Sequence, residues 1–131
     1  MRILIIADEV WNDELFGNNV WSNWFNGFDA DLAEIYGSPG TPKNKCCERY
    51  FQLTDMMMVK SLFGKRAGSK FHISVPEMQL GTSTDNAEQM PTRFYRFMKL
   101  IAGEGIRMVR DLIWLTGRYD KKGMQEFITN F

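Results

Sequence analysis

Ile3-Leu4-Ile5-Ile6-Ala7-Asp8-Glu9 is the stretch that decides the fold. A continuous apolar run of this length is typical of a strand that is covered on both faces of a sheet. Two carboxylates follow where that strand ends. Ligands of open α/β sheets bind just beyond the carboxyl ends of the strands, so Asp8 and Glu9 are candidate substrate-binding residues.

A loop with one glycine follows, and Gly17-Asn18-Asn19 then begins an aromatic helix. Gly17 lets a ligand approach the backbone closely, and Asn18 or Asn19 can cap the helix, whose first N–H groups suit a phosphate or a sugar hydroxyl. The nearby carboxylates repel anions and favour a neutral polyol. The alternative is that the glycine only shapes a loop and the asparagines only cap a helix. The helix spacing predicts one shared apolar face for Val20, Trp21, Trp24, Phe25 and Phe28.

The next segments predict a βαβ opening followed mainly by helices. Residues 32–36 form the second strand, and residues 37–45 form a loop whose Ser38, Gly40 and Asn44 either contact a ligand or only connect elements. We expect a short helix over 46–53. A further helix follows, capped by Thr54 or Asp55, with Met58, Val59, Leu62 and Phe63 on its apolar stripe. Residues 71–75 alternate as an edge strand does.

The carboxyl-terminal part predicts a long helix from about Thr92 to Thr116 and a last helix capped by Asp120. Cations gather on one side of the long helix. They form either a solvated face or a contact with an anionic membrane surface. The packing face of the long helix is expected to comprise Phe94, Phe97, Met98, Ile101, Gly105, Met108, Leu112 and Leu115.

Composition limits the function classes. The 131 residues suit one domain, and the 44% hydrophobic content excludes a disordered chain. The net charge of zero argues against a nucleic-acid partner. Adjacent cysteines, Cys46 and Cys47, rarely form a disulfide, and with His72 as the single histidine we expect no metal site, no cofactor and reduced cytoplasmic thiols.

Several segments resemble the amino-terminal part of bacterial two-domain (GT-B) glycosyltransferases, the retaining enzymes that build cell-surface polysaccharides. The segments are Ile3 to Trp11, Gly17 to Val20, Asn23 to Phe25, Tyr36 to Gly40, Asn44 to Cys47 and Tyr50 to Asp55. The resemblance implies an acceptor-side domain of an enzyme that uses a nucleotide-sugar donor and a glycan or lipid-linked acceptor. It also implies a cytoplasmic location, with peripheral contact to the inner membrane through helix 92–116. The donor pocket and its carboxylates belong to the family's second domain, so no catalytic residue is assigned here.

The expected fold class is therefore α/β, a helix-rich, partial Rossmann-like unit over residues 1–131. A sheet with two firm strands and one doubtful strand leaves its edges open, which predicts truncation before the next strand and self-association of the fragment. Two alternatives stay open at this point. One is a receiver-like module, in which Asp8 and Glu9 hold Mg²⁺ and Asp55 is the phospho-acceptor; the other is a carbohydrate-binding module.

Overall fold

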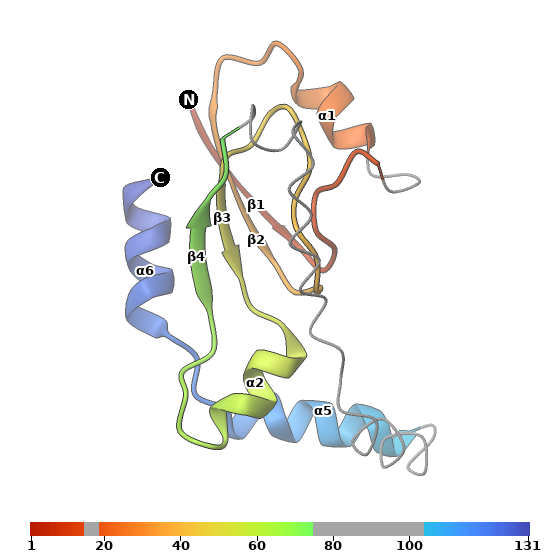
Figure 1. The fold of residues 1–131 in the computed structure, drawn as a ribbon, viewed down its shortest axis with the longest axis vertical. Helices are drawn as coiled ribbons and strands as arrows, with labels where there is room; N and C mark the ends of the chain where they lie inside the picture. Colours follow the sequence, from red (N-terminus) through yellow and green to blue (C-terminus); the bar gives the residue numbers. More distant parts are fainter. Residues whose placement is uncertain (15–18, 75–103) are drawn as a thin grey trace.

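The computed structural model describes residues 1–14, 19–74 and 104–131. These residues form an α/β fold around a four-stranded mixed sheet in the order β1-β2-β3-β4 (Figure 1). The first three strands are parallel, and β4 is antiparallel to β3. The arrangement is consistent with part of a Rossmann-like sheet. The strands are β1 (Arg2–Ala7), β2 (Asp31–Tyr36), β3 (Arg49–Gln52) and β4 (Ser69–His72).

The described helices surround this sheet on both faces and at one end. In Figure 1, α6 runs alongside the strands, while α2 and α5 lie together beyond the end of β3. Thr54 caps α2 by accepting a hydrogen bond from the amide of Met57, and Asp120 caps α6 in the same way for Gly123, which confirms both predicted caps. The helices are α1 (Asn19–Phe25), α2 (Asp55–Ser61), α5 (Glu104–Thr116) and α6 (Lys121–Asn130).

The two faces of the sheet bury separate apolar clusters. Alternation along β2 sends Leu32 and Tyr36 to the face covered by α1, and Ala33 and Ile35 to the face covered by α6. Phe127 of α6 is central to the second face. The cluster on the α1 face also contains Val10, Trp11, Cys47 and Tyr50, whereas the cluster on the α6 face contains Phe51, Leu53, Met58, Ala67, Phe127 and Phe131.

The predicted helix over 46–53 is wrong, because Arg49–Gln52 is the central strand β3. Tyr50 packs on one face of the sheet and Phe51 on the other. A strand buried on both faces shows no polar alternation, so a short run of this kind resembles a buried helix segment. The predicted edge strand exists as β4, but it spans Ser69–His72 and excludes Ile73 and Ser74; the last predicted residue, 75, lies outside the described residues.

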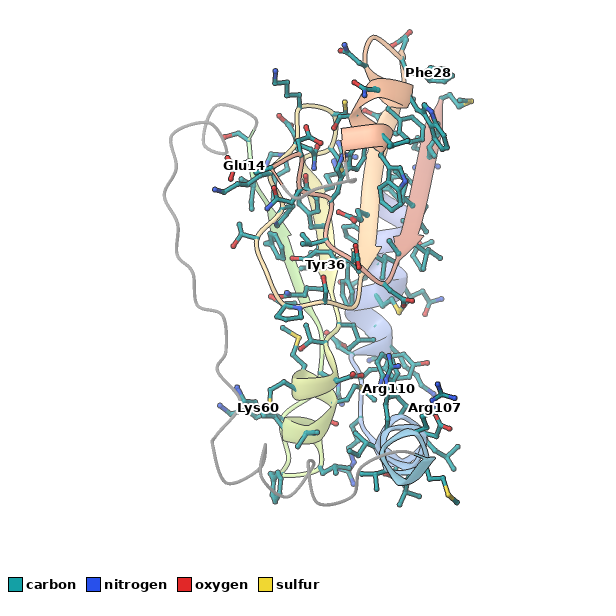
Figure 2. All side chains as sticks on the ribbon, turned by 90° about the vertical axis from the view of Figure 1, so that its right-hand side faces the viewer. Glu14, Phe28, Tyr36, Lys60, Arg107 and Arg110 are labelled. Atoms are coloured by element: carbon teal, nitrogen blue, oxygen red, sulfur yellow. The ribbon has the colours of Figure 1, made fainter. Side chains whose placement is uncertain are left out.

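The aromatic residues of α1 do not share one buried face, contrary to the prediction. Trp21 and Phe25 pack against Trp11, whereas Val20 and Trp24 are exposed. Trp11 is also hydrogen-bonded to Ser22. With Ser22 directed toward Trp11 in this way, the side of α1 that carries Val20 and Trp24 faces solvent. The fifth residue of the predicted face, Phe28, follows the end of the helix and is exposed as well (Figure 2).

Helix α5 also differs from its predicted packing face. The exposed residues include Met108, Leu112 and Leu115, while Ile113 packs toward the cluster on the α6 face. The rest of that predicted helix, residues 92–103, lies outside the described residues. The stripe predicted for α2 is buried only at Met58, and the helix ends at Ser61. None of the described helices is long and apolar enough to cross a membrane.

We expect Phe127→Ala to destabilise the chain strongly, because Phe127 is 2% exposed and its ring lies 5.7 Å from that of Phe51. The loss should be about 3–5 kcal/mol in the free energy of unfolding, measured by urea denaturation. Phe63→Ala is the matched control, since Phe63 is 85% exposed, and it should stay within about 0.5 kcal/mol of wild type. Equal effects of the two substitutions would contradict the packing of α6 on the sheet.

Candidate functional site

The carboxyl ends of β1, β2 and β3 bring three loops together at one end of the sheet, along the edge that the strand ends form. The amide of Val10 donates to Ser38 Oγ at 2.8 Å, which joins the loop after β1 to the loop after β2. Gln52 Nε2 donates to the Ser38 carbonyl oxygen at 3.0 Å, and the amide of Leu53 donates to Tyr36 O at 2.9 Å. Because each loop is bonded to another, this edge has a defined shape on which ligand contacts can be built.

Asp8 and Glu9 lie at this edge, directly after β1, as the sequence places them. Both side chains are exposed, and neither has a hydrogen bond or ion pair within the described residues. Lys43, in the loop between β2 and β3, forms an ion pair with Glu14 at 2.9 Å. The two carboxylates therefore face solvent as unpaired acceptors.

The glycine loop predicted to complete the site is not placed. Gly17 and Asn18 lie outside the described residues. Asn19 is the first residue of α1. Ligand contact by Gly17, Asn18 and Asn19 stays a prediction.

Trp11 fixes the path of the chain between β1 and α1. Its ring is fully buried, and its indole Nε1–H donates to Ser22 Oγ at 2.9 Å. Ser22 Oγ in turn donates to Asp13 Oδ1 at 2.5 Å, so the first turn of the loop is bonded to the helix it precedes. The backbone of the same loop pairs with Lys43: Lys43 N donates to Trp11 O at 3.0 Å, and Asp13 N donates to Lys43 O at 2.7 Å.

Asn44 has a structural role in place of the ligand contact considered from the sequence. The side chain is buried, and its Nδ2 donates to Trp11 O at 3.3 Å and to the Tyr50 hydroxyl at 2.9 Å. Its Oδ1 accepts the amides of Cys46 and Cys47 at 3.0 and 2.8 Å. The Tyr50 hydroxyl donates to the Cys47 carbonyl. Asn44 thus holds the loop before β3 against the loop after β1.

Glu34 is a buried carboxyl in the middle of β2, beneath these loops. Its Oε1 accepts the Trp11 amide at 3.0 Å, and its Oε2 has no hydrogen-bond partner among the described residues. Burial raises the pKa of Glu34 to about 8, against the smaller opposing effect of the Trp11 hydrogen bond. The carboxyl is therefore mostly protonated at neutral pH, when its O–H can donate to a further group.

Sequence analysis missed Glu34, although a signal was present. A glutamate inside an apolar run that reads as a doubly covered strand must be buried, and a buried carboxyl needs a partner or a proton. The neighbouring thiol behaves in the same way, since burial raises the pKa of Cys47 to about 12. Burial also raises the pKa of Cys46, and both cysteines are free, as expected. These thiols are poor nucleophiles at neutral pH.

The chemistry available at this edge is hydrogen-bond acceptance by two exposed carboxylates above a buried acid. The described residues contain no cluster of three or more side chains that could hold a metal ion. A surface depression lies elsewhere, on α6, where the described lining residues are Lys122, Gln125, Glu126, Thr129 and Asn130. It has no contact with the loops after β1, β2 and β3, so it contributes nothing to this site.

Comparison with known proteins gives no match: no family model, no curated protein and no solved structure is similar to this chain.

We expect Glu34→Gln to remove a pH dependence of stability. Between the ordinary Glu pKa of 4.5 and the folded value of about 8, the folded chain keeps a proton that the unfolded chain releases. The free energy of unfolding of the wild type should thus fall by up to about 1.4 kcal/mol per pH unit in this window, and level off above it. Glutamine keeps the acceptor for the Trp11 amide without this titration.

The measurement is urea denaturation of both chains from pH 5 to pH 8. The stability of the variant relative to wild type should rise steadily with pH. Glu14→Gln is the control, because the Glu14 side chain is 68% exposed, and its difference from wild type should show no such rise. A Glu34→Gln difference that does not change with pH would show that Glu34 is not buried as a neutral acid.

Proposed function

We propose that this chain is the acceptor-side part of a glycosyltransferase of cell-surface polysaccharide biosynthesis. The enzyme would transfer a sugar from a nucleotide-sugar to a glycan or lipid-linked acceptor. One observation supports this most directly: the parallel strands β1, β2 and β3 bring their loops to one edge, where Asp8 and Glu9 stand exposed and unpaired within the described residues. Ligands of open α/β sheets bind at such an edge.

The charge of this edge favours the acceptor over the donor diphosphate. Carboxylates accept strong hydrogen bonds from sugar hydroxyls, whereas they repel phosphate groups. The loop between β2 and β3 carries Lys43 and Lys45, and Lys43 is paired with Glu14. We therefore assign Asp8 and Glu9 to orienting acceptor hydroxyls. Gly17, Asn18 and Asn19 keep the role proposed from the sequence, close approach to the donor or the acceptor, and no catalytic base is assigned.

The strand order weighs against the receiver-like alternative. In receiver-type sheets the first strand lies between the second and the third. Here β2 lies between β1 and β3. Asp55, which would be the phospho-acceptor, instead accepts hydrogen bonds from Arg110 at 3.1 Å and from the Trp114 indole at 2.6 Å. Asp55 is the first residue of α2, and its carboxylate is hydrogen-bonded to side chains of α5.

Membrane contact through residues 92–116 stays part of the proposal, but the basic side chains contribute less to it than the sequence predicts. In Figure 2, which looks along α5, Arg107 and Arg110 lie on the side of the helix nearer the sheet. Arg110 is paired with Asp55 there, while the exposed side carries Met108, Leu112 and Leu115. Any contact of α5 with lipid would thus depend mainly on apolar side chains, with less help from charge than the sequence predicts.

We expect neutral oligosaccharides to bind this chain through Asp8 and Glu9. Saturation-transfer NMR and titration calorimetry with an oligosaccharide panel should detect binding that the double substitution D8N/E9Q weakens at least about tenfold, because charge-assisted hydrogen bonds are lost. Uridine diphosphate, tested in the same way, should gain affinity or stay unchanged when the carboxylates are neutralised.

Asp29→Asn is the matched control, since Asp29 is an exposed carboxylate that precedes β2. It therefore lies at the amino ends of the strands, away from Asp8 and Glu9. It should bind the oligosaccharides as the wild type does. Oligosaccharide binding that D8N/E9Q leaves intact, or that D29N weakens equally, would remove the two carboxylates from the proposed acceptor site.

A further inference from the structure

The outer edge of β1 is the unprotected side of this sheet. Within residues 1–14, 19–74 and 104–131, β1 pairs only with β2, and Figure 2 shows it at the border of the ribbon. The opposite edge strand, β4, carries Lys70, and a lysine on an edge strand discourages edge-to-edge pairing. From Ile3 to Ala7, β1 carries no charge at all. Among the described residues, the edge at β4 therefore carries a protecting charge and the edge at β1 is open.

Exposed apolar side chains lie on both faces of the sheet. On the α6 face, Ile6 of β1 is 74% exposed. On the other face, helix α1 carries the exposed side chains of Val20 and Trp24.

We propose that β1 pairs antiparallel with β1 of a second copy of this chain, forming a continuous eight-stranded sheet. Antiparallel pairing of identical strands places the twofold axis perpendicular to the sheet, so α1 of each copy lies on the same face. The proposal rests on the outer edge of β1 and does not require the function proposed above, although Asp8 takes part in both.

Charge and side-chain alternation select one register. Residues that lie opposite each other must point to the same face, so the axis passes through a residue, and Leu4 and Ile5 are the two central residues of β1. An axis at Ile5 sets Leu4 against the second copy's Ile6, and Arg2 against its Asp8. An axis at Leu4 would set the Arg2 guanidinium against the second copy's Ile6. The first register pairs apolar with apolar and opposite charges with each other, so we assign the axis to Ile5.

Sedimentation velocity and native mass spectrometry test this register by charge reversal. The wild type should be a dimer. D8R, and separately R2D, should place like charges opposite each other twice per dimer and weaken association about tenfold or more. An equimolar mixture of D8R and R2D should restore a heterodimer, because each chain then meets the opposite charge at both positions. D8R removes no described contact, whereas Arg2 also bonds Phe131 O at 2.6 Å, so circular dichroism must show that R2D is folded.

A matched pair of apolar substitutions identifies the surface. Ile6→Lys should give a monomer, while Leu115→Lys, at a side chain 84% exposed on α5, should leave the dimer intact. Should R2D fail to fold, this pair and D8R decide the outcome. A monomeric wild type at high concentration, a dimer unaffected by I6K and D8R, or a dimer broken by L115K would overturn the proposal. Folded D8R and R2D that form no heterodimer would overturn the assigned register.

Discussion

The burial of Trp11 is the constraint on which the arrangement of this molecule depends. A chain that leaves β1 must return across the sheet before it can enter β2, and Trp11 fixes where it does so. Its amide donates to Glu34, its carbonyl accepts from Lys43 and Asn44, and its indole donates to Ser22. These four partners lie on three segments, so one residue connects β2, α1 and the loop before β3. The buried polar groups of Trp11 are all satisfied, as burial requires.

The burial of the Glu34 carboxyl is the energetic cost of this arrangement. A carboxyl under a closed loop loses hydration, and one hydrogen bond from the Trp11 amide does not replace it, so the group keeps its proton near neutral pH. Asp8 and Glu9 are instead exposed to solvent, directly after β1. The fold thus separates a neutral buried acid, which supports the loop after β1, from two solvated ones that are available to a ligand. This separation supports the proposal that the site binds hydroxyl groups and not phosphates.

The sequence predicts the elements with strong local signals and fails where packing decides. β1, β2, β4 and the caps at Thr54 and Asp120 follow from apolar runs and capping side chains, and the structure has them. β3 was predicted as a helix, because a strand with both faces covered lacks alternation. The orientation of α1 depends on its contact with Trp11, which no periodicity reveals. For the site, the positions of Asp8 and Glu9 were predictable from the end of β1, whereas Glu34 required knowledge of its burial.

Hydrogen exchange of Trp11, followed by NMR, tests the central role of this residue most directly. Its amide and indole protons are buried and bonded to Glu34 and Ser22, so both should exchange only when the whole chain unfolds. They should therefore exchange as slowly as the amides of Ala33 and Ile35 in β2. Exchange of either proton at the rate of an exposed turn such as Gly64 would contradict the account, since the loop after β1 would then open independently of the sheet.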